Sequence, residues 1–458
     1  MIELGDALTA VAERLPGYLP EQRWSGAHGR PFASAAVRWH EVVFHEGDVA
    51  LVWALVDATH EDGEVVAYQL FVGLRSSLDL PDFLHGKERE VIGVVPQAGG
   101  HDLIAYDALV DPDLAVAILH LVAPEVEVEV RRPIVLEHSN SSVVFDEAII
   151  LKVIRRVEPG PNPDMTITRE LARRGFPHVL APQAELQRDG TDLAVLREFL
   201  VGATDGWVLA RTSVRDLLAS RLPPEECGGD LAHESERLGT VLGELHLGLA
   251  DVWGTQPADV ATWVAQMEDQ LREAEAAAAG APEVAVPDPD EVRDRYARLA
   301  ELEDAGTQIT IHGDLHLAQV IRVDDGWRVL DFEGEPARRR DDRMTVSSPL
   351  RDVAGIMRSL HYAAATGLLE WDPEDLVLVE LARAWEDRNR EAFLHGYLAV
   401  PGVERLLPAG EDGRAEVLGA FELDKAVYEL AYELRYRPDH APIPAEGIAR
   451  LVGERSTP

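Results

Sequence analysis

The sequence predicts an α+β protein in which β-rich segments precede a long helical region. Its 458 residues suffice for two or three domains of ordinary size. In the first part of the chain, alternating apolar side chains flank Asp-Gly pairs at 62–63 and 189–190, a pattern typical of β-hairpins. Further on, apolar residues recur at three- and four-residue steps, as in 231–253, which indicates amphipathic helices.

These patterns divide the chain into three parts. The first, 1–125, is expected to be an α+β unit in which residues 103–121 are helical. The second, 126–205, is β-rich, and the third, 206–458, is helical with a Pro-rich loop before residue 291.

Composition and charge narrow the class of protein. The formal charge of −39 argues against nucleic acid or an anionic membrane as a partner, because both would repel the chain. A single cysteine, Cys227, fits a reducing cytoplasm and excludes an internal disulfide. No run of about 20 apolar residues is present, and the first residues lack a signal-peptide pattern, so we expect a cytoplasmic protein without a membrane span.

The segment 311–336, IHGDLHLAQVIRVDDGWRVLDFEGEP, has the spacing of a phosphotransferase centre. Asp314 would accept the proton of a substrate hydroxyl. Gln319, five residues later, and Asp331, on a following hairpin, would hold magnesium against the phosphates of ATP. Protein kinases place their Asp, Asn and metal-binding Asp in the same way. The segment therefore predicts a phosphotransferase that uses ATP.

Lys152 is the predicted phosphate-contacting residue. It lies in the apolar strand 148–154, where an unpaired ammonium would be costly to bury. In a kinase its partners would be ATP and an acid on the next helix, here Glu170. The alternative is that Lys152 projects outward from an edge strand. Lysine is scarce in this chain, since only Lys87, Lys152 and Lys425 occur, which favours a specific need for an ammonium group.

Two further stretches fit an ATP site. The Ser-Asn-Ser-Ser run at 139–142 precedes a strand, and Ser139 and Ser141 could contact phosphate oxygens, although the run lacks glycine and is equally consistent with a polar turn. The strand that ends near Glu198 and Leu200 occupies the place of a kinase hinge, whose backbone would face adenine.

A helical pattern at 416–436 suggests the acceptor. It places aromatic and acidic residues at three- and four-residue steps, a combination that suits a sugar, because rings stack on sugar faces and carboxylates accept hydroxyl hydrogen bonds. A solvated helix face with Lys–Glu pairs is the alternative. His246, on the apolar face of another helix, is more simply explained as a core histidine than as a ligand.

Six motifs together resemble the bacterial maltokinase family, which belongs to the aminoglycoside phosphotransferase-like kinases of actinobacteria and includes related glucosamine kinases. The motifs are EQRW, SNSSVVFD with LKVIRR, HGDLHLAQV, LDFEGEP, SPLRDVAG and DKAVYELAYELRYRP, and they span nearly the whole chain. The resemblance implies a bilobal, aminoglycoside phosphotransferase-like fold with an N-terminal cap domain ahead of the ATP-binding lobe.

The resemblance also implies roles for individual residues. Asp314 matches the catalytic Asp, Gln319 and Asp331 match the Mg²⁺ ligands, and Lys152 matches the phosphate-contacting lysine, with Glu170 as its partner. The residues expected to bind the sugar are those of the C-terminal helix, with two secondary candidates near the catalytic Asp: Tyr428, Glu429, Tyr432, Glu433, His316 and Arg322.

The chain departs from the maltokinase pattern at several positions, including Ser25, His361 and Asp439-His440. Fewer aromatic residues weaken the case for a disaccharide, whose second ring would need stacking. A smaller, cationic sugar would favour the remaining carboxylates, including Glu429 and Glu433. We therefore expect a glucosamine kinase that uses ATP and phosphorylates the 6-hydroxyl.

Three alternatives remain open. The first is a maltokinase that makes maltose 1-phosphate, and the second is an aminoglycoside phosphotransferase, whose polycationic substrates would also suit acidic residues. The third is a catalytically inactive, kinase-like binding protein, against which the complete set of candidate residues argues. The expected partners are ATP and a small sugar, and the expected state is a monomer or a weak oligomer.

Overall fold

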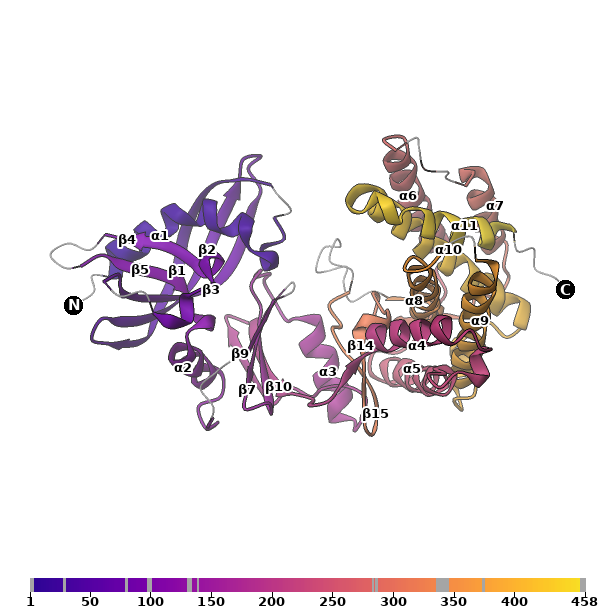
Figure 1. Ribbon diagram of the computed structural model, residues 1–458, viewed down its shortest axis with the longest axis horizontal. Coiled ribbons are helices and arrows are strands. Elements are labelled where there is room, and N and C mark those ends of the chain that lie inside the picture. The colour runs from indigo at the N-terminus through magenta and orange to yellow at the C-terminus, as the bar shows by residue number, and fades with distance from the viewer. Residues whose placement is uncertain are drawn as a thin grey trace. The chain divides into compact units, whose positions relative to one another are not determined.

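The computed structural model describes residues 4–27, 30–78, 81–96, 101–129, 134–137, 140–281, 284, 287–334, 346–372 and 375–453. The chain forms two compact units (Figure 1). The N-terminal unit consists of 1–169 and 181–201, and the C-terminal unit consists of 170–180 and 202–458.

The N-terminal unit contains a first antiparallel sheet with strand order β1-β2-β3-β5-β4. Its elements are α1 (Leu4–Tyr18), β1 (Phe32–Glu46), β2 (Val49–His60), β3 (Val65–Ser76), β4 (Val91–Val95), β5 (Leu103–Asp107) and α2 (Pro112–Val122). The predicted hairpin around Asp62-Gly63 joins β2 to β3, with Thr59 paired to Val65. The predicted helix at 103–121 is correct only from Pro112 onwards, because residues 103–107 form β5.

A second five-stranded sheet follows, with order β6-β7-β8-β10-β9. Its strands are β6 (Ile134–Glu137), β7 (Ser141–Phe145), β8 (Ile149–Val153), β9 (Ala184–Arg188) and β10 (Thr191–Glu198). The helix α3 (Pro163–Arg173) lies between β8 and β9 in the sequence. Asp189, with φ of 50°, and Gly190 form the predicted turn between β9 and β10.

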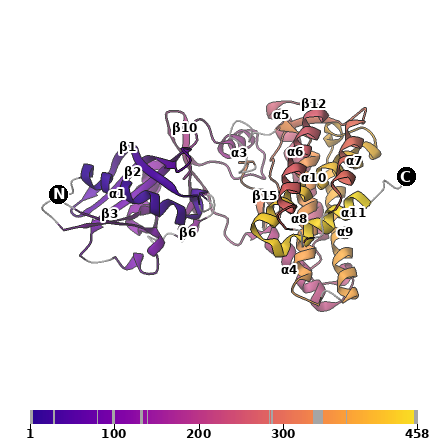
Figure 2. The ribbon, with the colours of Figure 1, turned by 90° about the horizontal axis from the view of Figure 1, so that it is seen from above.

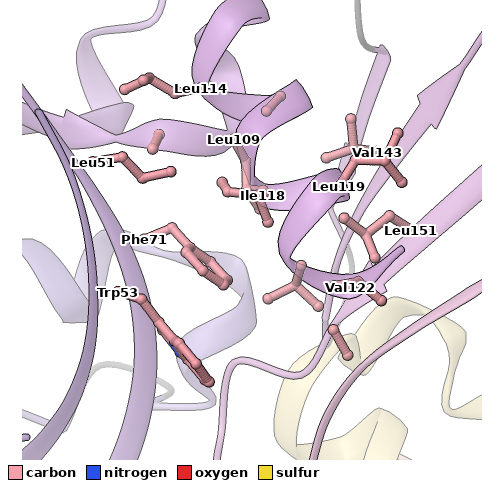
Figure 3. Packing of buried hydrophobic residues seen from close by; sticks show 14 of the residues in the cluster. Leu51, Trp53, Phe71, Leu109, Leu114, Ile118, Leu119, Val122, Val143 and Leu151 are labelled. Atoms are coloured by element: carbon pink, nitrogen blue, oxygen red, sulfur yellow. The ribbon is translucent and has the colours of Figure 1, made fainter. Parts of the chain in front are cut away.

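The two sheets and α2 share one hydrophobic core. Figure 3 shows Trp53 and Phe71 of the first sheet, Leu119 of α2, and Val143 and Leu151 of the second sheet around the same interior. Burial of this apolar surface is the main force that holds the sheets together. The segments on either side of the predicted boundary near residue 125 are thus packed as a single unit.

The C-terminal unit is mainly helical, as predicted (Figures 1 and 2). Its helices are α4 (Gly206–Ser220), α5 (Ala232–Trp253), α6 (Val260–Ala278), α7 (Pro289–Ala300), α8 (Leu350–Leu368), α9 (Leu376–Leu398), α10 (Glu411–Tyr436) and α11 (Pro442–Gly453). The helix α10 packs against α6, α8 and α11. Within the described residues, no helix combines the length and the apolar character that a membrane span requires.

Short strands in this unit carry the central motif. β11 (Thr204–Asp205), β14 (Val320–Val323) and β15 (Gly326–Val329) form one sheet, and β12 (Gln256–Pro257), β13 (Thr307–Thr310) and β16 (Val346–Ser347) form another. The segment with the His-Gly-Asp sequence runs from the end of β13 to the start of β14. The residues after β15 lead to Asp331.

Candidate active site

His312 connects the two halves of the central motif. Its ring is 1% exposed, and its Nε2 lies 2.8 Å from the carbonyl oxygen of Leu330. Since a carbonyl only accepts, Nε2 carries the proton, and Nδ1 is left to accept from the backbone N–H of Asp314 at 3.4 Å. The histidine of His-Gly-Asp thereby holds the loop of Asp314 next to the strand end that leads to Asp331.

Asp352 of α8 holds the same loop from the other side. Its buried carboxylate accepts from the backbone N–H groups of His312 at 2.8 Å and Gly313 at 3.0 Å. His246 Nε2 lies 3.2 Å from Asp352, and its Nδ1 lies 2.9 Å from the Tyr397 hydroxyl. Burial alone would raise the pKa of Asp352, but these hydrogen bonds, above all that from His246, hold it below its usual value. The prediction that His246 is a satisfied core histidine is confirmed.

Asp314 lies in a narrow pocket between the His-Gly-Asp loop and α10. Its Oδ1 accepts a hydrogen bond of 3.0 Å from Nζ of Lys425. The pocket is also lined by Gln270 of α6, whose Nε2 donates to Oδ1 of Asp424 at 2.8 Å, and by Phe421. Sequence analysis did not select Gln270 or Asp424, and the rarity of lysine was the signal that marked Lys425.

The two predicted metal ligands lie next to each other. Gln319 Nε2 donates to Asp331 Oδ2 at 3.2 Å, and rotation of this amide by 180° would present its oxygen instead. Asp331 has φ of 62°, a left-handed conformation that is unusual for a residue with a side chain and that clusters at functional sites. Asp331 and Glu333 each offer a carboxylate oxygen within 4.8 Å of the other. These hard oxygen donors fit Mg²⁺, and Glu333 is a ligand candidate that sequence analysis missed.

The two secondary candidates near Asp314 differ in their surroundings. Arg322 of β14 donates to Glu234 of α5 at 2.5 and 3.2 Å and to the Gly326 carbonyl, so its guanidinium ties a hairpin to a helix. These bonds give Arg322 a structural role, and its contact with the substrate stays a prediction. Burial lowers the pKa of the His316 imidazole, and the nearby Asp314 carboxylate only partly offsets this. Contact between His316 and the substrate stays a prediction.

The acidic residues predicted to bind sugar are engaged in helix packing. Glu429 accepts from Arg358 of α8 at 2.6 Å. Glu433 is 2% exposed and accepts from the Tyr362 hydroxyl at 2.7 Å and from Arg437 at 2.6 Å.

The face of α10 that borders the Asp314 pocket is therefore marked by Phe421, Asp424 and Lys425. Tyr428 follows on that face, with its ring centroid 4.8 Å from Lys425 Nζ. Tyr432 is 41% exposed and packs against Tyr436. Sugar contacts by these two tyrosines stay predictions.

In the N-terminal unit, Lys152 lies on a central strand. It pairs with Ser142 of β7 on one side and Val195 of β10 on the other, so the edge-strand alternative is wrong. Asp164, in the first turn of α3, has Oδ2 3.8 Å from Lys152 Nζ and 3.0 Å from Nη1 of Arg197. Asp164 is thus an acidic partner of Lys152 that sequence analysis missed.

The other predicted ATP-site residues have the following surroundings. Glu170 accepts from Arg173 at 2.8 Å within the C-terminal unit, and its pairing with Lys152 stays a prediction. Ser139 lies outside the described residues. Ser141 is 1% exposed, and its hydroxyl accepts from Arg155 at 2.8 Å. Glu198 is the exposed last residue of β10, and Leu200 lies close in sequence to the boundary between the two units at 201–202. The contact of this segment with adenine stays a prediction.

The fold and these residues define a class. A five-stranded antiparallel sheet with a lysine on a central strand, followed by a helical unit with a His-Gly-Asp loop and a neighbouring Gln–Asp pair, has the parts of a protein-kinase-like phosphotransferase. A family model described as the maltokinase N-terminal cap domain matches residues 18–111.

Relatives specify the family. The chain is 30% identical over 338 residues to the glucosamine kinase of Streptacidiphilus jiangxiensis, covering 71% of this chain and 74% of that protein. It is 26% identical over 336 residues to a glucosamine kinase of Mycolicibacterium smegmatis, covering 71% and 80%. The chain belongs to this maltokinase-like glucosamine kinase family.

Solved structures confirm the predicted fold class. A glucosamine kinase in crystal form B superposes with a TM-score of 0.67 at 23% identity, covering 98% of this chain and 99% of that one. A glucosamine kinase in complex with glucosamine, ADP and inorganic phosphate gives 0.65 at 23% identity, covering 98% and 100%.

Proposed function

We propose that this protein is a glucosamine kinase that transfers the γ-phosphoryl group of ATP to the 6-hydroxyl of D-glucosamine in the cytoplasm. The observation that carries the proposal is the pocket at Asp314, where a general-base carboxylate, a second carboxylate on Asp424 and a lysine converge. The names of the related proteins support the choice of acceptor. The finer expectations, a monomer or weak oligomer and a cytoplasmic location, belong to this proposal.

Two groups of residues would bind ATP, the phosphoryl donor, and its metal ion. Gln319 and Asp331, with Glu333 beside them, would hold Mg²⁺, which neutralises phosphate charge when bound. Lys152 would contact the phosphates of ATP, and Asp164 orients its ammonium group. Because phosphoryl transfer depends mainly on positioning and on charge stabilisation, these residues need no covalent role.

On the acceptor side, Asp314 does the proton chemistry. Lys425 occupies Oδ1 of Asp314, which leaves Oδ2 to accept the proton of the sugar hydroxyl. The hydroxyl oxygen then forms its bond to the γ-phosphorus, and the bond between that phosphorus and the β–γ bridging oxygen breaks to release ADP. Lys425 fixes the carboxylate in one orientation, which is the contribution that such a reaction requires.

The charge of the pocket favours an amino sugar. Lys425 already neutralises Asp314, and Gln270 turns the carboxylate of Asp424 into a fixed acceptor. The ammonium group of glucosamine would therefore find an acidic partner at Asp424. Maltose carries no cation that would use this carboxylate.

The test is a comparison of ADP release with glucosamine, glucose, maltose and kanamycin as acceptors. We expect glucosamine to be preferred, and product NMR should place the phosphate on its 6-oxygen. Comparable rates with maltose would contradict the proposal. Asp314→Asn should abolish turnover while nucleotide binding persists, and retained sugar phosphorylation would show that Asp314 is not the catalytic residue.

A further inference from the structure

Arg155 joins the two sheets of the N-terminal unit at Ser141, which belongs to the run 139–142 that is expected to contact phosphate; this run is called the phosphate loop below. It lies two residues after the end of β8 and is 1% exposed. Its Nε donates to Oγ of Ser141 at 2.8 Å, and its Nη2 pairs with the carboxylate of Asp107. The guanidinium lies over the ring of Trp24, 4.8 Å from its centroid. One side chain thus links the first residue of β7 to the last residue of β5.

The backbone around Arg155 is fixed by the first sheet as well. Gln69 of β3 donates its backbone N–H to the Arg155 carbonyl at 2.8 Å. The Gln69 side chain, which is 0% exposed, donates to the carbonyls of Ile154 at 3.0 Å and Leu193 at 2.9 Å. It accepts from Nε1 of Trp53 at 2.9 Å, so every polar atom of its amide is used. The backbone just after the strand of Lys152 is therefore held by the first sheet.

We propose that Arg155 is a positioning residue for ATP. Through Arg155, the first sheet fixes the position of the phosphate loop relative to Lys152. This inference rests on the proposed kinase function. Arg155 is too deeply buried to touch the nucleotide itself, and it acts through Ser141, where the run 139–142 enters β7. Since Ser142 pairs with Lys152 in the same ladder, a shift of Ser141 would move the loop relative to the lysine.

An arginine is required because two partners on different strands must be reached at once. The planar guanidinium presents Nε and Nη2 in a fixed fork, one toward a hydroxyl and the other toward a carboxylate. A lysine at this position keeps the charge but can satisfy Asp107 or Ser141, not both in the same geometry. The first sheet therefore contributes to nucleotide binding, although none of its residues contacts the nucleotide in this proposal.

The experiment measures the affinity of the full-length protein for the Mg²⁺ complex of a non-hydrolysable ATP analogue by calorimetry. It is combined with the KM values for ATP and for glucosamine. Arg155→Lys should weaken nucleotide binding about tenfold, the equivalent of about 1.4 kcal/mol. The KM for glucosamine should change by no more than about twofold. Ser141→Ala should show a smaller loss, and adding it to Arg155→Lys should change little, because both remove the same link.

Arg75→Lys is the matched control. Arg75 also bridges two groups, the Tyr106 hydroxyl at 2.8 Å and the Asp111 carboxylate at 2.7 Å, but both of these partners precede the second sheet in the chain and lie outside its strands. Arg75→Lys should lower the melting temperature without changing nucleotide affinity. Unchanged nucleotide affinity in Arg155→Lys, or an equal rise of both KM values, would overturn the inference. If Arg155→Lys does not fold, unchanged affinity in Ser141→Ala would overturn it. Failure of the wild-type protein to bind the analogue would instead count against the proposed function.

Discussion

Replacement of Asp352 by asparagine should damage both the stability of the C-terminal unit and catalysis. The carboxylate accepts three hydrogen bonds, two of them from the backbone of the His-Gly-Asp loop. Asparagine keeps one acceptor oxygen and places an amide donor against the remaining donors. At least one buried N–H then loses its partner, which costs about 1–3 kcal/mol of stability. The remaining hydrogen bonds also lose the contribution of the negative charge. We expect a loss of about 3 kcal/mol in the free energy of unfolding.

For a unit of this size, that loss corresponds to a fall of about 6–12 °C in melting temperature. The loop that carries Asp314 should also shift, and a displacement of about 1 Å can reduce turnover about a hundredfold. Differential scanning calorimetry and the rate of ADP release measure the two effects. The control is Asp375→Asn, because Asp375 caps α9 near the surface and asparagine caps a helix equally well.

The same variant has a pH signature. The pKa of Asp352 is lowered in the folded protein, so its ionisation stabilises the fold above the unfolded value near 3.9. That contribution is lost as the pH falls through the still lower folded pKa. The stability gap between wild type and Asp352→Asn should be full at pH 5–7 and should close in strong acid. A gap that is small at pH 7, with turnover preserved, would refute the role assigned to Asp352.

Two further substitutions test the pocket. Lys425→Met removes the 3.0 Å hydrogen bond to Asp314. Loss of such a part-buried, charge-assisted bond should lower kcat/KM about tenfold to a hundredfold. The control Lys87→Met replaces an exposed lysine and should have no effect. Gly355→Ala would place a Cβ 2.1 Å from the carbonyl oxygen of Leu315 in the catalytic loop, so it should cost about 1–3 kcal/mol and reduce turnover. Gly5→Ala, with open space around it in α1, should be neutral or stabilising by calorimetry.

Local signals in the sequence predicted local structure well. The Asp-Gly pair at 189–190 forms its hairpin turn because both residues adopt positive φ, which few other residues tolerate. The spacing of Asp314, Gln319 and Asp331 predicted a common site because a hairpin brings its two ends together. The structure places Gln319 and Asp331 within hydrogen-bond distance. A residue that turns the chain, or a spacing set by one hairpin, needs no distant partner.

Side chains whose role depends on a distant partner could not be assigned in this way. Glu429 and Glu433 fall on a helix face that suits a sugar, but Arg358 and Tyr362, each 71 positions away, use both carboxylates. Asp164 pairs with Lys152, although nothing in its local pattern indicates that contact. The strand at 103–107 was mistaken for helix because a short apolar run has no period that separates the two structures.

The helix α8 shows what periodicity alone leaves undecided. Three of its residues contact the segment around Asp314. Asp352 accepts from the N–H groups of His312 and Gly313, Gly355 lies against the Leu315 carbonyl, and Ser359 accepts from the N–H of Leu317. Arg358 and Tyr362 of the same helix bind the carboxylates of α10.

One rigid helix therefore sets the distance between Asp314 and the face of α10 that carries Asp424 and Lys425. Glu429 and Glu433 of α10 contribute to this distance through their bonds to Arg358 and Tyr362 of α8. Glu429 and Glu433 therefore help to place Asp424 and Lys425 next to Asp314, and their own contact with the sugar stays a prediction.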